Sequence, residues 1–466
     1  MNLFSDLEKF SSNTCVVDQN YKKFSYLDLL KLSDFSTSKI KKGSVVFLLC
    51  ENSFEFLAIY VGLIRKKIAT FLLGSNINDD YLNNLIKLYQ PQFIIKPITI
   101  KFENSFEEEK IISQKYHILK TEFDFYSIKR DLALLLSTSG STGSPRFVKI
   151  SYVNIFDNTK RISDFLKISS KDTAITTLQP NYVYGLSIIN SHLIKGAKLV
   201  MCKYSLVEKK FWELLKKTKV TNFGGVPYTY DLLDKLKFEK MNLPNLKYIT
   251  QAGGKLSLNL LEKFISICKK KRLKMIIMYG QTEASGRISF LDWKFIEKKR
   301  GSIGNPIKGG KFFLYNNKKK MIDNNIKSGE LVYEGKNVML GYATNRKDLN
   351  KDHSEKKLFT GDIARKDDDG FYFIEGRNTR FIKITGHRFN LEELQNELEK
   401  NKIFCVCTGS EDNLKIFLKK KFSHKKLSEF ILKRFNIKKI NYLIYENVAI
   451  PRNENGKILY NKLNNI

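Results

Sequence analysis

The stretch Asp131–Ile150, DLALLLSTSGSTGSPRFVKI, joins two short apolar segments through a loop rich in hydroxyl groups and glycine. Leu132–Leu136 is long enough for a buried strand, and Phe147–Ile150 is a second β-prone run. Residues 137–144 between them are all Ser, Thr or Gly. Flexible glycines, free backbone N–H groups and hydroxyl donors suit a loop that wraps a phosphate chain. A flexible linker is the alternative, but linkers seldom lie between two apolar β-prone runs.

A second polar motif, Tyr279-Gly280-Gln281-Thr282-Glu283, follows the apolar run Met275–Ile277. In open α/β sheets, ligands bind at the carboxyl ends of strands. There a tyrosine ring can stack on adenine, Thr282 can donate to a phosphate, and Glu283 can hold a Mg²⁺ that bridges phosphates. The motif therefore indicates nucleotide binding at a strand end.

Further candidates lie upstream and downstream of this motif. Gly253 and Gly254 follow the β-prone run 248–250, where two glycines let a flat ring approach the backbone. Asp362 follows Leu358-Phe359, and a carboxylate there suits two ribose hydroxyls. Lys457 follows a predicted Asn-Gly turn at an exposed loop tip, from which its ammonium could swing in to neutralise a carboxylate and a phosphate. A generic surface lysine is the alternative, since the chain has many.

Five motifs together resemble those of the adenylate-forming superfamily, which includes acyl-CoA synthetases, aryl-CoA ligases, peptide-synthetase adenylation domains and luciferases. They occur in the family's order over essentially the whole chain: the Ser/Thr/Gly loop, Tyr-Gly-Gln-Thr-Glu, Thr360-Gly361-Asp362, Gly376-Arg377 and Gly456-Lys457. The loop does not match the P-loop, because no Gly-Lys-Ser/Thr follows Gly140 at the required distance.

The resemblance assigns a role to each matching residue. It implies that the ATP phosphates are bound by Thr138, Ser139, Gly140, Ser141, Thr142, Gly143 and Arg146. It implies that adenine and ribose are bound by Gly253, Gly254, Tyr279, Gly280, Asp362 and Arg377. Lys457, Glu283 and Thr282 are the implied catalytic residues, with Glu283 also the metal ligand. Tyr182, Tyr184 and Gly185, expected in a short loop, would line the acyl pocket; core aromatics are the alternative. Thr379, Lys383, Gly386 and Arg388 would form the hinge and the thiol-acceptor side.

The implied reaction has two halves. A carboxylate attacks the α-phosphorus of ATP, giving an acyl-adenylate and pyrophosphate, and a thiol then attacks the acyl carbon and releases AMP. The implied cofactors are ATP and Mg²⁺, and the acceptor is CoA or the phosphopantetheine of an acidic carrier protein. Between the two half-reactions, rotation about residues 377–380 would remove Lys457 from the site and bring Gly386 to it.

This sequence departs from the family pattern in three places. Arg146 stands where a lysine is usual, and Phe147 stands where a glycine is usual, so we expect a loop less mobile than that of its relatives. Thr379 replaces the usual charged hinge residue. Amino-acid-activating members usually have an Asp at 180–186 that holds the substrate ammonium group, and this chain has no Asp between Gln179 and Ser187. This argues against an amino acid as the substrate.

The chain alternates strand-like and helix-like segments between residues 44 and 95, which predicts a parallel sheet with crossover helices. Later segments turn to β-hairpins, including an Asp369-Gly370 turn. Asp367–Asp369 lacks the spacing of a calcium loop. We expect a large α/β region with a β-rich segment, residues 1–376, and a small mobile α+β domain, residues 377–466.

The composition limits the class of protein. A formal charge of +33 could indicate a nucleic-acid or anionic-membrane partner, but the basic clusters are scattered and we attribute them to composition, so nucleic acid is not expected. The six cysteines show no zinc-site spacing and are expected to be reduced, mostly buried thiols. With no signal peptide or transmembrane run, we expect a cytoplasmic protein.

Three rival functions stay open. The enzyme could stop at the adenylate, or it could activate an amino acid. Alternatively, a basic relative without activity could bind nucleic acid, although the presence of Glu283, Asp362 and Lys457 argues against this. Neither the acid nor the thiol acceptor is fixed by the sequence.

Overall fold

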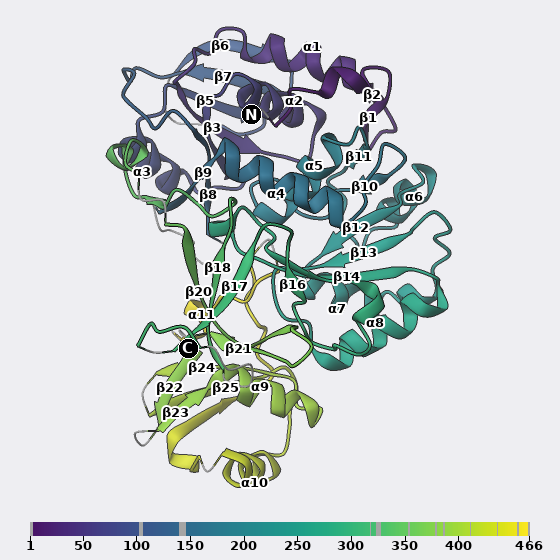
Figure 1. Cartoon of the computed structure of the whole chain (residues 1–466), viewed down its shortest axis with the longest axis vertical. Coiled ribbons are helices and arrows are strands. Elements are labelled where there is room, and N and C mark those ends of the chain that lie inside the picture. Colours follow the sequence, from purple (N-terminus) through teal and green to yellow (C-terminus); the bar gives the residue numbers. More distant parts are fainter. Residues whose placement is uncertain are drawn as a thin grey trace.

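The computed structural model describes residues 3–101, 106–138, 146–316, 318–322, 328–352, 355–377, 380–384, 387–410, 412–435, 437–453 and 456–464. Within these, the side chains at 381, 383, 387, 388, 390, 393, 396, 400 and 461 are not described. A larger body contains two sheets, and the C-terminal elements form a smaller group below it (Figure 1).

An eight-stranded sheet has the order β19-β9-β8-β4-β3-β5-β7-β6. Its strands are β3 (Val45–Cys50), β4 (Ala69–Gly74), β5 (Phe93–Pro97), β6 (Glu107–Ile112), β7 (Tyr116–Lys120), β8 (Leu132–Ser137), β9 (Phe147–Ser151) and β19 (Tyr342–Ala343). β3 pairs in parallel with β4 and β5, and β4 pairs in parallel with β8. The crossover helices are α2 (Phe54–Arg65) and α3 (Asp79–Tyr89), which begin at the caps Ser53 and Asn78. The predicted parallel sheet is confirmed.

A nine-stranded sheet has the order β16-β15-β14-β13-β12-β10-β11-β1-β2. Its strands are β1 (Thr14–Asp18), β2 (Lys23–Ser25), β10 (Thr173–Ile175), β11 (Lys198–Met201), β12 (Asn222–Gly225), β13 (Tyr248–Gln251), β14 (Lys274–Tyr279), β15 (Ser289–Leu291) and β16 (Asn305–Pro306). Helices α6 (Lys209–Lys217), α7 (Pro227–Lys235) and α8 (Leu258–Lys270) connect its parallel strands. β12, β13 and β14 are parallel neighbours, so their carboxyl ends meet at one edge.

Helices fill the space between the eight-stranded and the nine-stranded sheet. α4 (Tyr152–Phe165) and α5 (Val183–Leu193) lie there, as Figure 1 shows, and α1 (Tyr26–Thr37) packs on α2. The largest apolar core takes side chains from α2, α5 and both sheets. The two sheets therefore form one layered body.

The beginning of α5 corrects one prediction. Tyr182 is its N-cap and makes no side-chain cap hydrogen bond, whereas Tyr184 and Gly185 lie inside the helix rather than in a loop. Without a Ser, Thr, Asp or Asn cap, and with a glycine in its first turn, the helix gives no start signal in the sequence.

A four-stranded antiparallel sheet has the order β17-β18-β20-β21. Its strands are β17 (Lys311–Tyr315), β18 (Gly329–Glu334), β20 (Lys357–Lys366) and β21 (Tyr372–Arg377). The turn between the last two strands is at Asp369-Gly370, as predicted, with Gly370 at a φ of +84°. This is the expected β-rich segment.

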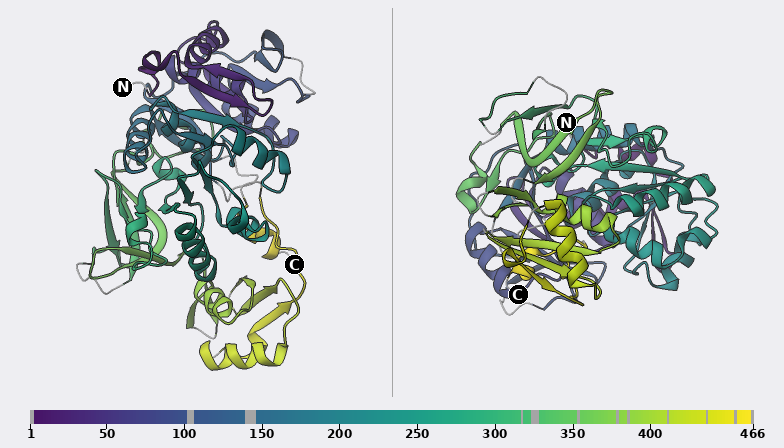
Figure 2. Two further views of the ribbon diagram at one scale, coloured as in Figure 1. Left: turned by 90° about the vertical axis from the view of Figure 1, so that its right-hand side faces the viewer. Right: turned by 90° about the horizontal axis from the view of Figure 1, so that it is seen from below.

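The C-terminal elements form a small α+β group of two sheets. They are β22 (Phe381–Ile384), β23 (His387–Asn390), α9 (Leu391–Lys400), β24 (Cys405–Ser410), β25 (Asn413–Leu418), α10 (His424–Phe435), β26 (Tyr442–Tyr445) and α11 (Tyr460–Asn464). Within residues 405–445 the order is strand, strand, helix, strand, which agrees with the expected α+β character. The expected boundary at residues 376 and 377 falls at the end of β21. The last part of the chain returns toward the larger body (Figure 2).

Two further properties of the described residues bear on the sequence predictions. All six cysteines are free and buried. Among the helices described, none combines the length and the apolar character needed to cross a bilayer.

Candidate active site

The site is centred on the carboxylate of Asp362 in β20. Arg377, its register partner at the end of β21, donates from Nε to Asp362 Oδ1 at 2.8 Å. Tyr279, at the end of β14, donates its hydroxyl to Asp362 Oδ2 at 2.5 Å. The carboxylate raises the pKa of Arg377, and burial together with the carboxylate raises the pKa of Tyr279. Two sheets thus meet at the buried Asp362 through residues predicted to bind adenine and ribose.

Lys457 reaches this centre from the last turn of the chain. Its Nζ lies 5.5 Å from the centroid of the Tyr182 ring. Burial lowers the pKa of Lys457 to about 8, and the positive charge of Arg377 adds to this effect. The negative charges of Glu283 and Asp362 act in the opposite direction. The structure therefore brings together the predicted lysine and the predicted carboxylates.

A compact turn holds Lys457 in this place. Asn453 accepts from the backbone N–H of Lys457 at 2.9 Å and donates its own N–H to the Lys457 carbonyl at 2.9 Å. The guanidinium of Arg452 lies over the Tyr228 ring of α7, 5.3 Å from its centroid. Lys457 is half-buried, so the prediction of an exposed position for it is wrong: its neighbours Arg452 and Gly456 pack against Tyr228 of the larger body.

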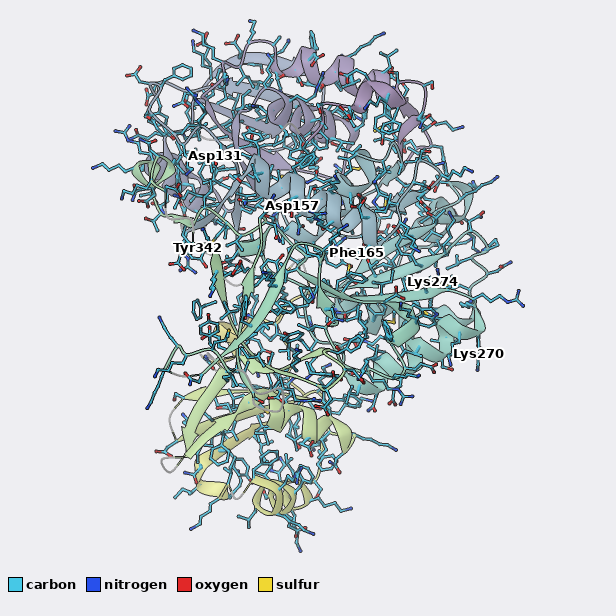
Figure 3. All side chains as sticks on the ribbon, in the orientation of Figure 1. Asp131, Asp157, Phe165, Lys270, Lys274 and Tyr342 are labelled. Atoms are coloured by element: carbon cyan, nitrogen blue, oxygen red, sulfur yellow. The ribbon has the colours of Figure 1, made fainter. Side chains whose placement is uncertain are left out.

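Glu283 lies in a one-turn helix, Thr282–Ala284, directly after the Tyr279 motif. Its Oε1 accepts a hydrogen bond from the Tyr342 hydroxyl at 3.0 Å, and its backbone carbonyl accepts from Met339 at 2.9 Å. The guanidinium of Arg146 lies 4.1 Å from the centroid of the Tyr342 ring. Tyr342 lies in β19 at the junction of the larger body and the four-stranded sheet (Figure 3). Tyr342 therefore connects Glu283 to the end of the Ser/Thr/Gly loop.

Two predicted glycines are required by close contacts. A Cβ at Gly280 would lie 1.7 Å from the Gly286 carbonyl oxygen. A Cβ at Gly253 would lie 2.5 Å from the Tyr182 hydroxyl oxygen, and Gly253 has a φ of +80°. Gly253 thus lets the end of β13 approach Tyr182, and Gly280 lets the end of β14 approach the backbone of Gly286.

Tyr182 and Tyr184, called the tyrosine wall from here on, both lie in the largest apolar core, as the core-aromatic alternative has it, and they adjoin a buried arginine. The two rings meet edge to face, with centroids 6.3 Å apart. The guanidinium of Arg287 lies 4.8 Å from the centroid of Tyr184, and the Tyr184 hydroxyl bonds Thr250 in β13. Sequence reasoning missed Arg287 and Tyr342 as site residues. A single arginine directly after the small residues 284–286 was the available signal for Arg287, and the motif 338–342 was the signal for Tyr342.

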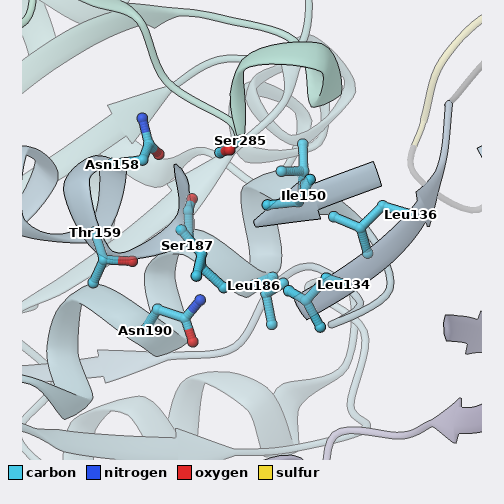
Figure 4. A pocket seen from close by; sticks show the side chains of 11 residues that line it. Leu134, Leu136, Ile150, Asn158, Thr159, Leu186, Ser187, Asn190 and Ser285 are labelled. Carbon is cyan, nitrogen blue, oxygen red and sulfur yellow. The ribbon is translucent and has the colours of Figure 1, made fainter. Parts of the chain in front are cut away.

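A small cavity lies beside these residues, between β8, β9, α4 and α5. Figure 4 shows polar side chains facing apolar ones across it: Asn158, Thr159, Ser187, Asn190 and Ser285 against Leu134, Leu136, Ile150 and Leu186. None of the residues predicted for the site lines this cavity.

Several predicted residues lie outside the described residues. These are Ser139, Gly140, Ser141, Thr142, Gly143, Thr379 and Gly386, and the side chains of Lys383 and Arg388. Thr138 and Arg146, which flank the loop, are described, as are Gly254 after β13 and the buried Thr282.

Two curated proteins are similar in sequence to parts of this chain. A 2-succinylbenzoate–CoA ligase of Bacillus licheniformis is 28% identical over 267 residues, covering 57% of this chain and 54% of that protein. A long-chain-fatty-acid–CoA ligase of Bacillus subtilis is 26% identical over 275 residues, covering 58% of this chain and 48% of that protein. The matches thus span about half the length of these curated relatives.

A solved structure confirms the predicted fold class. O-succinylbenzoate coenzyme A synthetase from Bacillus subtilis, in complex with ATP and magnesium ion, superposes with a TM-score of 0.79 at 19% identity, covering 99% of each chain. The sequence model described as AMP-binding enzyme matches residues 3–343 of this chain. The resemblance predicted from the motifs is confirmed: this chain belongs to the AMP-binding enzyme family.

Proposed function

We propose that the protein is an AMP-forming acid–thiol ligase, which uses ATP to convert a carboxylic acid to an acyl-adenylate and then to a thioester. The observation that carries this proposal is the position of Lys457, which the C-terminal turn brings to the group formed by Glu283, Asp362 and Arg377. Lys457 comes from a distant segment of the chain and lies near Asp362, the carboxylate expected to bind ribose. In that position its ammonium could neutralise negative charge during adenylation.

The nucleotide would be held by residues at or just after the ends of β8, β13, β14 and β21, together with Asp362 within β20. Asp362 suits the ribose hydroxyls once Tyr279 and Arg377 have fixed the carboxylate. The Tyr279 ring and Gly253-Gly254 would bind adenine, and the loop 138–146 would bind the phosphates, with Arg146 at its end.

Glu283 fits a Mg²⁺ ligand because Tyr342 holds one of its carboxylate oxygens in place. Among the described residues no group of three or more His, Cys, Asp or Glu could hold a metal ion. Mg²⁺ commonly binds through one or two carboxylates plus substrate phosphates and water, which agrees with such a site. When bound, the ion would neutralise phosphate charge.

Catalysis of the first half would be positioning and charge neutralisation. The substrate carboxylate is already a nucleophile, so the protein needs no general base. One carboxylate oxygen attacks the α-phosphorus, the bond to the β-phosphate oxygen breaks, and pyrophosphate leaves. The Lys457 ammonium would lie against the attacking carboxylate and the α-phosphate as negative charge gathers there.

The second half-reaction, in which the thioester forms, would require Lys457 to leave the site. We propose that residues 377–466 form the mobile domain and rotate about residues 377–380, bringing Lys383, Gly386 and Arg388 toward the acyl-adenylate. Residues 401–466 hold 14 Lys and Arg against 5 Asp and Glu, a net charge of +9, which suits CoA phosphates or an acidic carrier protein. The free thiols and the use of ATP support a cytoplasmic setting.

A carboxylate-dependent ATP–pyrophosphate exchange assay over a panel of acids tests the proposal. We expect exchange with a subset of acids and, after addition of CoA or a phosphopantetheinyl carrier protein, thioester and AMP in equal amounts. An amino-acid-activating enzyme would instead exchange only with amino acids. Absence of exchange with every acid, together with salt-dependent DNA binding, would support the nucleic-acid alternative.

A further inference from the structure

Arg287 is a buried cation for which the described residues provide no acceptor. It lies between the one-turn helix 282–284 and β15, and only 2% of its surface is exposed. Its backbone is fixed by Asn158, which donates to the Arg287 carbonyl at 2.6 Å. All three guanidinium nitrogens lack a hydrogen-bond partner among the described residues.

The groups around Arg287 do not supply the negative charge that would pair with its guanidinium. Its guanidinium lies 4.8 Å from the Tyr184 ring centroid, and a cation–π contact is weaker than a paired, hydrogen-bonded ion. Asp172 affects the titration of Tyr248 and His192 in the same neighbourhood. However, Asp172 is engaged by Lys247 at 2.9 Å and by Ser169. No described carboxylate forms an ion pair with Arg287.

The charge on Arg287 persists at neutral pH. Burial lowers its pKa to about 10, because the charged form is desolvated, and Tyr184, Tyr248 and Tyr182 act in the opposite direction. A charge that stays buried without a partner is costly, and such groups are retained where a ligand supplies the partner. The hydroxyl of Tyr248 is a second buried group without a described partner in this neighbourhood.

The tyrosine wall relates the position of Arg287 to that of Lys457. Lys457 Nζ lies 5.5 Å from the Tyr182 ring centroid, and the Tyr182 ring meets the Tyr184 ring. Arg287 is on Tyr184, and its charge acts on both tyrosines. Lys457 and Arg287 thus contact two successive rings of one wall. An acid whose reacting carboxylate is at Lys457 would extend along the wall with its other end toward Arg287.

We propose that Arg287, with the Tyr248 hydroxyl, binds a second carboxylate at the far end of the substrate, so that the enzyme activates dicarboxylic acids. This inference rests on the proposed function and narrows its substrate class. A guanidinium is matched to a carboxylate by parallel N–H···O bonds, and burial away from water strengthens them. The same cation disfavours the ammonium group of an amino acid and the apolar end of a long fatty acid.

Matched acid pairs test the inference by ATP–pyrophosphate exchange. Straight-chain and benzene dicarboxylates are compared with their monomethyl esters, which have one carboxylate and nearly the same length. We expect the wild-type kcat/KM for the best diacid to exceed that of its ester by about 100-fold, as for a lost hydrogen bond to a charged group. Arg287→Met should abolish this preference while leaving the KM for ATP unchanged.

The controls separate binding from folding. Arg300→Met removes an exposed arginine on the same body and should leave the preference intact. Because Arg287→Met removes a buried charge that has no partner among the described residues, its Tm without acid should be at least that of the wild type. The best diacid should raise the Tm of the wild type but not of the variant. If Arg287→Met does not fold, Tyr248→Phe, which removes only the hydroxyl proposed to bind the same carboxylate, takes its place and should weaken the diacid preference.

The outcomes distinguish the two proposals. Exchange with monocarboxylic acids but no diacid preference overturns the inference and leaves the ligase function standing. A diacid preference that persists in Arg287→Met also overturns it, because the second carboxylate then binds elsewhere. Exchange with no acid at all defeats the ligase function, and the inference with it.

Discussion

At the scale of single residues, the sharpest prediction concerns the side chain of Lys457. Lys457→Met keeps much of the stem and removes the charge next to the reacting groups. We expect the rate of ATP–pyrophosphate exchange to fall by about 10²–10³-fold, the usual loss for one charge-stabilising donor. Thioester formation from a supplied acyl-adenylate should change little, because Lys457 would have left the site by then. Lys462→Met, at an exposed position of α11, is the matched control. Equal losses in both half-reactions would contradict the assignment.

The same residue predicts a pH dependence. Its pKa is lowered to about 8, so the ammonium loses its proton where an ordinary lysine keeps it. Since the charged form is the active one, kcat/KM for adenylation should be full below this pKa and fall as pH rises through about 8. The descending limb should be absent from the residual activity of Lys457→Met. Coincident profiles for the two proteins would assign the limb to another group.

At the scale of elements, Phe147 ties the end of the Ser/Thr/Gly loop to the core. It is the first residue of β9, is buried, and meets Phe71 and Tyr89 edge to face at centroid distances of 4.9 and 5.7 Å. Phe147→Ala should therefore lower the free energy of unfolding by about 3–5 kcal/mol, measured by chemical denaturation. Phe125→Ala, at an exposed ring, should change it by less than about 0.5 kcal/mol. Similar effects of the two substitutions would show that Phe147 does not anchor the loop.

Elements with a strong local signal were predictable, and long-range contacts were not. The strand at 45–50 and the helix after Ser53 follow from an apolar run, a polar break and helical periodicity. The motif residues Tyr279, Asp362 and Lys457 were recognised, but their meeting depends on how three sheets and the last turn pack. The half-burial of Lys457 and the burial of the Arg287 guanidinium away from any described acceptor arise from this packing, which a one-dimensional pattern does not encode.

At the scale of the whole molecule, the proposed cycle needs the C-terminal turn to leave the larger body. A Cβ at Gly456 would lie 2.8 Å from the Tyr228 Cβ, so Gly456→Cys with Tyr228→Cys should form a disulfide after a small shift. We expect the oxidised double variant to retain pyrophosphate exchange and to lose thioester formation, which reductant restores. Each single variant serves as a control, and the native cysteines are all buried. Undiminished thioester formation by the oxidised protein would exclude the rotation.

The central claim, that a carboxylate oxygen attacks the α-phosphorus of ATP, is tested most directly by isotope transfer. The enzyme is given ATP, a thiol acceptor and an acid labelled with ¹⁸O in the reacting carboxylate, and the products are analysed by mass spectrometry. One ¹⁸O atom should appear in AMP, because the acyl carbon–oxygen bond breaks when the thiol attacks, and pyrophosphate should carry none. Label in inorganic phosphate with formation of ADP would mean attack at the γ-phosphorus and would contradict the account.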